Sequence, residues 1–181
     1  REQLRHGANQ IKIMAGGGVA SPTDPIDGTQ YSLEELTAAC EEATAANTYV
    51  MAHAYSPRSI TRAVQCGVRT IEHGNLLDEA TAKVMKSEGA FLVPTLATYA
   101  VLADEGKRLL WSAEMLGKLD RVKDAGTQAI AIAKAEGIPI AFGTDLLGAM
   151  HPQQAIEWRL RSTVQTPVEI LQSATSIAAK V

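Results

Sequence analysis

The sequence predicts an α/β fold in which helices cover a parallel sheet. Short apolar runs alternate with longer segments of helical periodicity along most of the 181 residues, an alternation typical of strand–helix–strand units with parallel strands. The runs are apolar throughout, as expected for strands that are buried on both faces. Hydrophobic residues make up 46% of the chain but aromatic residues only 4%, so small aliphatic side chains must fill the space between sheet and helices. We expect a single domain over residues 1–181.

Five strands are expected, at residues 10–15, 48–52, 68–72, 90–94 and 138–143. Local signals mark the starts of the helices between them. Ser32 with Glu35 three residues later forms a capping box, and Ser56 precedes a proline at the first helical position. Asp78 is expected to cap the next helix, and Thr166 the last. Residues 95–136 have a helical pattern interrupted by Gly106, Gly117 and Gly126, which predicts an excursion above the sheet and one longer helix.

Charge and composition exclude several classes of partner. The net charge is −3 and the basic residues are dispersed, so no basic face is expected to bind nucleic acid. No apolar run approaches the roughly 18 residues that a membrane span requires, and we expect no membrane partner. Cys40 and Cys66 both lie in helical patterns. We expect two free thiols and a reducing, cytoplasmic location.

Ionisable residues collect at the predicted carboxyl edge of the sheet. Lys12 lies in the first strand, and each of three later strands runs directly into a polar residue: His53, His73 and Asp145. Each has an ordinary structural explanation alone, as a hydrogen-bonded histidine, a lysine extending from a rim or a turn aspartate. Together they predict one site, because the loops of parallel strands converge at that edge.

These residue types suit a metal ion. Two imidazoles and a carboxylate are donors for zinc or a similar divalent cation. A lysine amine is normally protonated, but after losing its proton it can add carbon dioxide. The resulting carbamate on Lys12 would be an anionic oxygen donor able to bridge two cations.

Five motifs carry a family resemblance: IKIMA with GGV within residues 11–19, SPTDP at 21–25, AHAY at 52–55, TIEHG at 70–74 and FGTD at 142–145. In this order they resemble the amidohydrolase superfamily, and within it the imidazolonepropionase-like branch of Xaa-Pro dipeptidase (prolidase)-type enzymes. The resemblance implies a partial TIM (β/α)8 barrel, in which this chain supplies about five βα units, strands four to eight.

The resemblance also implies a role for each residue. Lys12 would be carboxylated by CO2 and bridge two divalent metal ions, with zinc as the first expectation. His53 and His73 would bind the more exposed ion, while Asp145 would bind the buried ion and act as general base. Tyr55 would contact the scissile carbonyl. The implied reaction is hydrolysis of an amide or peptide bond in a dipeptide or N-acyl amino acid, and the loop at residues 16–30 would overhang the site unless it is purely structural.

One departure from the family is plain. The His-x-His pair of barrel strand one is absent, and the remaining histidines, His6 and His151, do not fit it. Strands one to three and the flanking β-domain are also absent. We therefore expect a part of a barrel that is weakly active or inactive alone, whose open edges favour a homo-oligomer or association with the rest of the barrel.

Two other functions stay open. A mononuclear deaminase or cyclic-amide hydrolase would keep the fold, although Lys12 argues against it. A non-catalytic α/β domain would use the polar strand ends to hold an anion or a regulatory ligand.

Overall fold

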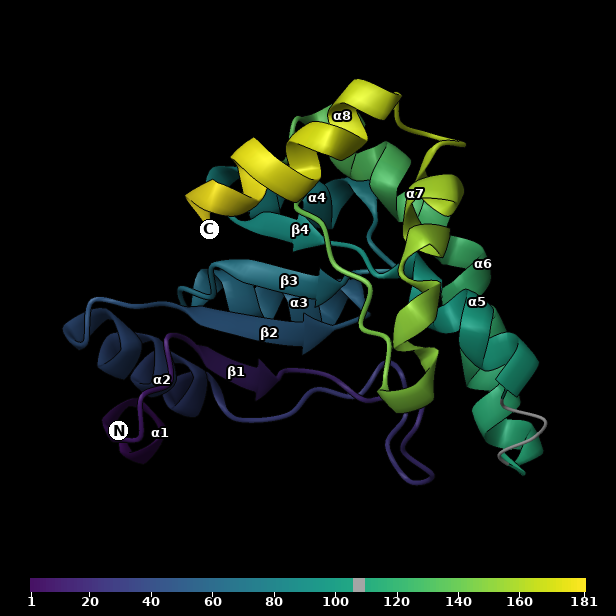
Figure 1. Ribbon diagram of the computed structural model, residues 1–181. Helices are drawn as coiled ribbons and strands as arrows, with labels where there is room; N and C mark the ends of the chain where they lie inside the picture. The colour runs from purple at the N-terminus through teal and green to yellow at the C-terminus, as the bar shows by residue number, and fades with distance from the viewer. Residues whose placement is uncertain (106–109) are drawn as a thin grey trace.

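Four parallel strands form the sheet, in the order β1-β2-β3-β4 (Figure 1). The computed structural model describes residues 1–105 and 110–181. The strands are β1 (Ile11–Met14), β2 (Val50–Ala54), β3 (Thr70–His73) and β4 (Phe91–Val93). Every neighbouring pair is parallel, which confirms the predicted α/β class. All four strand arrows point toward α5, α6 and α7 (Figure 1).

The predicted fifth strand is much shorter than expected. Its only pairing within the described sheet is one parallel bridge between Leu92 and Ile140. In this bridge the Leu92 amide donates to the Pro139 carbonyl at 3.0 Å, and the Ala141 amide donates to the Leu92 carbonyl at 2.8 Å. Because β4 has only three residues, few of its backbone amides and carbonyls are left to pair with this segment. The prediction of a full strand over residues 138–143 was therefore wrong, although the segment lies where the fifth strand would be.

Helices follow the strands as predicted. They are α1 (Glu2–Arg5), α2 (Leu33–Ala45), α3 (Pro57–Gln65), α4 (Glu79–Ser87), α5 (Leu96–Glu105), α6 (Ala113–Glu136), α7 (Ala155–Arg161) and α8 (Pro167–Gln172), with short turns η1 (Gly148–Gln153), η2 (Ser173–Ile177) and η3 (Ala178–Lys180). The predicted caps are confirmed: Ser32 and Thr166 form capping boxes, and Ser56 and Asp78 accept from the backbone of the first turn. These caps satisfy amides that have no partner inside the helix.

Glycines do not interrupt α6, which runs through both Gly117 and Gly126; Gly106 lies outside the described residues. A Cβ atom on Gly126 would lie 2.6 Å from the Leu96 side chain and 2.9 Å from the Asn75 amide nitrogen. Gly126 therefore lets α6 pack closely against the start of α5 and the loop after β3. The helix therefore continues through this predicted weak point, because close packing outweighs the roughly 1 kcal/mol that a glycine costs inside a helix, and α6 is the longer helix that the sequence predicts.

The two faces of the sheet differ in chemistry. Ile13, Ala52, Ile71 and Leu92 lie side by side on one face, and the last three are fully buried in a core with residues of α2, α3, α4 and α6. The register places Lys12, His53 and Glu72 together on the other face. Side chains alternate along a strand, so the face that carries the ionisable groups is the one without this helical layer.

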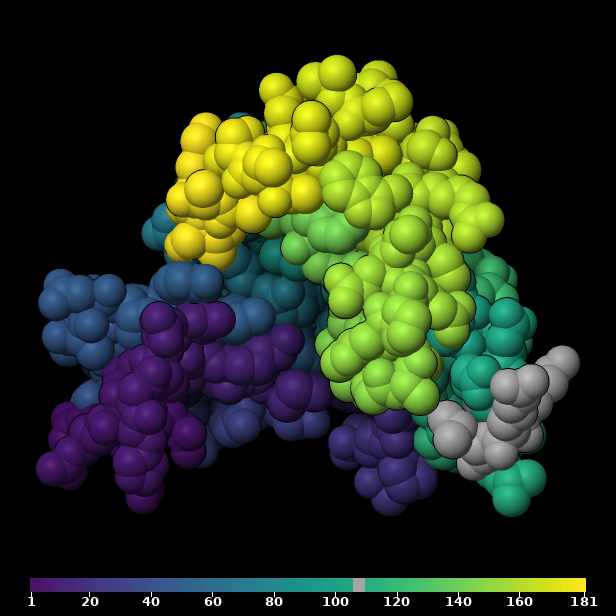
Figure 2. Space-filling model, viewed as in Figure 1, coloured from purple at the N-terminus to yellow at the C-terminus, as the bar shows by residue number. Residues whose placement is uncertain are grey.

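The helix-free face lines a hollow. Residues of the C-terminal part arch over one end of it, while the strands lie further back (Figure 2). A cavity there is lined by Met51, Thr70 and Glu72 on one side and by Ala141, Phe142 and Val181 on the other. Both cysteines are free thiols, as expected. Among the described residues, no helix is both long and apolar enough to cross a bilayer.

Candidate active site

The ends of β2 and β3 bring two predicted site residues together. The ring centroids of His53 and His73 are 4.7 Å apart, with the rings at 70° to each other. Tyr55 lies against both, with centroid distances of 4.7 Å to His53 and 5.4 Å to His73. All three side chains are buried. The predicted convergence of these residues is therefore present in the fold.

His53 is held by the loop at residues 16–30. Its Nε2 atom lies 2.8 Å from the carbonyl oxygen of Gly17. Because a carbonyl only accepts, Nε2 carries the hydrogen and Nδ1 keeps a free lone pair. Burial lowers the pKa of His53, the Gly17 carbonyl opposes that shift, and the positive charge of Lys12 adds to it. Gly17 itself must be glycine, since a Cβ atom there would lie 1.8 Å from the Pro25 carbonyl oxygen.

His73 has an unusual backbone. Its φ is +76°, and the amide of Gly74 donates to the carbonyl of Glu72 at 3.2 Å, so the three residues form a classic γ-turn, a rare and strained conformation. Burial lowers the pKa of His73 well below its usual value, and the neighbouring charges of His53 and Lys12 lower it further. Both histidines are therefore neutral at pH 7, the form that binds cations.

Asp145 also has a left-handed backbone, with φ +49°. Strained residues cluster at functional sites because the surrounding structure must hold them. Burial raises the pKa of the Asp145 carboxyl group, and the charge of Lys12 opposes that rise. The charge of Asp145 in turn raises the pKa of Tyr55, after the larger effect of burial. Lys12 and Asp145 thus lie within electrostatic range of the residues at the ends of β2 and β3.

The convergence of the predicted ligands is incomplete. Within residues 1–105 and 110–181, no three His, Cys, Asp or Glu side chains are arranged to hold a metal ion together. His53 and His73 form a pair, Asp145 lies on the same cavity, and Lys12 is exposed on β1. The segment before Asp145 is joined to the sheet by the single bridge at Ile140, so the sheet fixes Asp145 less firmly than the histidines.

A cavity of about 250 Å³ lies over these groups. Its floor and walls include His53, Tyr55, His73 and Asp145. The remaining lining comes from the loop at residues 16–30 and from α5: Gly18, Val19, Ala20, Ser21, Asp24, Gln30, Thr98, Tyr99 and Leu102, with Met14 and Leu147 at the sides. The loop therefore lines the cavity, and its place over a bound substrate stays a prediction.

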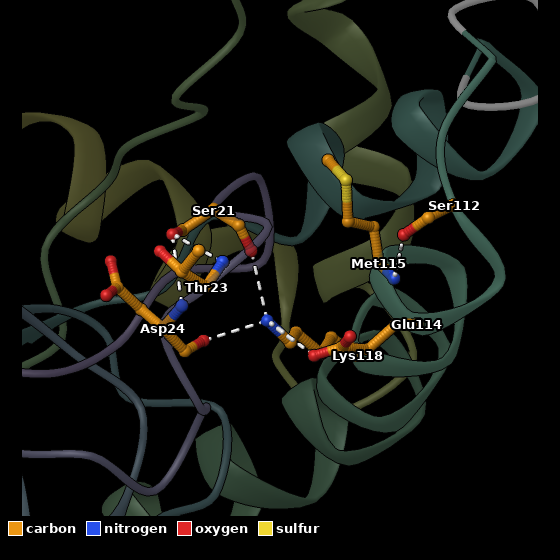
Figure 3. Close-up of polar contacts among 7 residues, drawn as sticks. All are labelled: Ser21, Thr23, Asp24, Ser112, Glu114, Met115 and Lys118. Carbon is orange, nitrogen blue, oxygen red and sulfur yellow. Dashed lines mark hydrogen bonds and ion pairs between the residues drawn. The ribbon is translucent and has the colours of Figure 1, made fainter.

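The loop is tied to α6 through Lys118 (Figure 3). The Lys118 ammonium group donates to the carbonyl oxygens of Ser21 at 3.0 Å and Asp24 at 2.8 Å. Its side chain is only 10% exposed and lies 3.5 Å from the Glu114 carboxylate. The Ser21 hydroxyl accepts from the amide of Asp24 at 3.2 Å, which closes the turn. This anchor was not predicted, since Lys118 lies 94 residues beyond Asp24 in a helical pattern.

Three further residues were missed. Glu72 is buried on the helix-free face of β3. The Thr70 hydroxyl donates to its carboxylate at 2.6 Å, and burial raises its pKa. A carboxylate inside an apolar strand was the available signal. Thr95 bonds His73 Nδ1 at 2.7 Å, and the Tyr99 hydroxyl donates to the Tyr55 oxygen at 3.0 Å. Neither carries a local signal, because its partner comes from another part of the chain.

The sequence model of the amidohydrolase family matches residues 1–181. The chain belongs to the amidohydrolase family. Ochratoxinase from Aspergillus niger is 34% identical over 179 residues, which cover 98% of this chain and 37% of that protein. This membership confirms the family predicted from the five motifs.

Solved structures agree. A prolidase in complex with N-methylphosphonate-L-proline has a TM-score of 0.96 and 55% identity, over 99% of this chain and 44% of that one. A Xaa-Pro dipeptidase with bound methionine has a TM-score of 0.88 and 28% identity, over 99% and 45%. The chain thus spans less than half the length of these relatives, and the fold is that part of an amidohydrolase barrel.

Proposed function

We propose that this protein hydrolyses amide bonds, with Xaa-Pro dipeptides and N-acyl amino acids as the substrates to test first. The observation that carries the proposal is the cavity at the carboxyl ends of the strands, where two neutral imidazoles, a phenol and a carboxylate meet. The similarity to a prolidase and to an ochratoxinase supports the same chemistry.

The donor set fits a divalent cation. His53 presents a free Nδ1 lone pair because its Nε2–H is bonded to Gly17, and His73 has Nε2 without a protein partner among the described residues. Asp145 supplies carboxylate oxygens. Lys12 would join them after its amine nitrogen bonds the carbon of CO2 and releases a proton. Zinc suits these donors best, and when bound it polarises a carbonyl and makes water acidic enough to attack near neutral pH.

The remaining chemistry falls to the chain's own side chains. Asp145 would accept the proton of the attacking water and return it to the leaving nitrogen as the C–N bond breaks. Tyr55 would donate its hydroxyl hydrogen to the carbonyl oxygen as negative charge develops there. Burial raises the pKa of Tyr55, so the phenol keeps its proton at neutral pH and remains a donor. The loop at residues 16–30 would cover the substrate and exclude water.

The test uses the intact polypeptide, with its metal content and its hydrolysis of Xaa-Pro dipeptides measured together. Wild-type protein should bind about two zinc ions and lose activity on chelation. His53→Ala should lose both metal and activity, whereas His6→Ala, at the exposed end of α1, should keep both. Release of ammonia without cleavage of dipeptides or N-acyl amino acids, or full activity in His53→Ala, would contradict the proposal.

A further inference from the structure

We propose that Arg161 is a positioning residue for Asp145, because its buried guanidinium group holds the segment at residues 141–146 at a point where β4 cannot. The catalytic role of Asp145 rests on the function proposed above. The contacts of Arg161 do not depend on that function.

The pairing between β4 and this segment stops at a proline. Leu92 forms two bonds of a parallel ladder: it donates to the Pro139 carbonyl at 3.0 Å and accepts from the Ala141 amide at 2.8 Å. One step further, the ladder would need a bond from the amide of residue 94 to the Ala141 carbonyl. Residue 94 is proline, which has no N–H to donate. The sheet therefore stops holding the chain shortly before Asp145.

Arg161 supplies the donor that Pro94 lacks. Its Nη1 atom donates to the Ala141 carbonyl oxygen at 3.1 Å. Its guanidinium carbon lies 5.3 Å from the centroid of the Phe142 ring, within the range of a cation–π interaction. Its Nε atom donates to the side-chain oxygen of Gln165 at 2.8 Å, which fixes the direction of the guanidinium plane. Two consecutive residues of the segment are thus attached to α7.

The guanidinium group lies in the interior of the protein, where a charge is costly. Arg161 is 0% exposed, and buried charges are kept in proteins where partners compensate them. Burial lowers the pKa of Arg161 to about 10, and the charge of Glu157 opposes that shift. The group therefore stays charged at neutral pH. A charged donor forms a stronger hydrogen bond than a neutral one, so Arg161 can replace the missing ladder bond.

The same helix also fixes the chain after Asp145. Leu146 is buried in a cluster with Ala97 of α5. The Glu157 carboxylate accepts from the Ala97 amide at 2.7 Å. Glu157 and Arg161 are four residues apart on α7, so their side chains share one face of the helix. That face holds the chain on both sides of Asp145, which accounts for a non-glycine residue kept at φ +49°.

Hydrogen exchange in the intact polypeptide tests the attachment without reference to activity. Arg161→Met keeps the apolar stem and removes the donor. The amides of Leu92 and Ala141, which form the bridge, should then exchange about tenfold faster. The Phe91 amide, which bonds outside this segment at 2.9 Å, should keep its rate. Arg159→Met, at an exposed position of α7, is the matched control and should change none of the three.

Unchanged exchange at Leu92 and Ala141 in Arg161→Met would overturn the proposal, and so would equal acceleration of all three amides in a folded variant. Arg161→Met leaves the Glu157 charge buried without its neighbour. If that variant does not fold, the double variant Glu157→Gln/Arg161→Met, which removes both charges, takes its place with the same expected rates.

Pro94→Ala gives the second and more specific test. It adds an N–H at the position where the ladder needs one, so in the Arg161→Met background it should restore slow exchange of the Ala141 amide. In the wild-type background, where Arg161 already donates to that carbonyl, it should change little. A merely structural Arg161 would not respond to an added amide beside β4. Equal effects of Pro94→Ala in both backgrounds would therefore overturn the proposal.

Steady-state kinetics of the same variants test the consequence for Asp145. Arg161→Met should lower kcat about three- to tenfold, the effect of one hydrogen bond, with KM within about twofold because Asp145 acts in the chemical step. Pro94→Ala should recover most of that loss, and no recovery of kcat despite restored exchange would overturn the link to Asp145. If the wild-type protein cleaves no amide, the proposed function fails, while the exchange rates still decide for or against the attachment.

Discussion

The helix-packed face of the sheet and its carboxyl edge are built on different principles. On the packed face, residues such as Ile60, Ile71 and Leu92 are fully buried and need only apolar neighbours of suitable size. At the edge, each histidine needs a specific partner, Gly17 for His53 and Thr95 for His73. The backbone there is strained as well. The packed face therefore accounts for stability, whereas the edge holds the groups proposed for catalysis at some cost in stability.

Asp145→Asn should remove the catalytic activity proposed for the edge without destabilising the packed face. The amide cannot accept a proton, so we expect kcat/KM to fall about 10²–10⁴-fold, the usual contribution of a general base. The free energy of unfolding should change little, because asparagine keeps the size and shape of the side chain. Kinetics and urea unfolding of the intact polypeptide check both. Asp120→Asn, on the exposed surface of α6, is the matched control, and activity within tenfold of wild type in Asp145→Asn would rule out its role as the base.

Ile60→Ala should destabilise the packed face and leave the catalytic activity of the folded protein unchanged. Ile60 lies on α3 and is completely buried in the core, so its truncation should lower the free energy of unfolding by about 2–5 kcal/mol. The kcat of the molecules that remain folded should stay within about twofold of wild type. Val168→Ala, at a position 63% exposed, should change stability by less than about 0.5 kcal/mol. A fall in kcat as large as that of Asp145→Asn would mean that the two regions are not separable.

Glu157 holds the start of α5, a helix that lines the cavity at the edge, and its substitution should remove a pH dependence. Burial raises the pKa of this carboxyl group to about 7, against its usual 4.5, although the Ala97 amide and Arg161 oppose the shift. The folded protein then binds a proton more tightly than the unfolded chain, so stability is lost as pH rises from about 4.5 to about 7. The loss from this residue is about 3 kcal/mol.

Glu157→Gln cannot titrate, so its stability should not show this loss. The measurement is the difference in unfolding free energy between wild type and Glu157→Gln at pH 5 and at pH 8. Relative to the wild type, Glu157→Gln should be more stable at pH 8 than at pH 5. Glu41→Gln, on the exposed surface of α2, should follow the wild type at both values. If the unfolding free energy of Glu157→Gln changes with pH as that of the wild type does, the Glu157 carboxyl group is not the source of the pH dependence.

The fold was predictable where the signal is local. Ser32 and Thr166 mark helix starts because each cap is formed within four residues, and the first four strands are apolar runs that any parallel sheet would bury. The extent of the fifth strand and the weak point expected at Gly126 were misjudged for a common reason. One bridge at Ile140 and the close contacts of Gly126 depend on the packing of segments far apart in the chain, which a local pattern does not contain.

The candidate site likewise contains residues with a local sequence signal and residues without one. His53, His73 and Asp145 could be predicted because each follows an apolar run, and parallel strands end at a common edge. Their supporting partners could not. Thr95 and Tyr99 precede or begin an ordinary helix, and the part of Gly17 that binds His53 is its carbonyl oxygen, which every residue has. The groups proposed to react are thus marked by residue type, whereas the groups that orient them are identified only by tertiary structure.

Lys118→Met should give the smallest effect and shows how far the edge depends on its loop. Methionine keeps most of the apolar stem but loses the ammonium group that donates to Ser21 and Asp24. The loop at residues 16–30 should then close less often over the substrate, and KM should rise about three- to tenfold, as expected for the loss of charge-assisted hydrogen bonds. The kcat should stay near the wild-type value, because Lys118 touches none of the proposed reacting groups.

Steady-state kinetics and limited proteolysis within the loop would measure this effect. Lys123→Met is the matched control: it lies on the same helix and pairs only with Asp120 and Asp124 among the described residues. Its KM and its proteolysis rate should equal those of the wild type. If both variants behave alike, the anchor does not position the loop, and the closure of the cavity must come from the close packing of Gly17 against the Pro25 carbonyl instead.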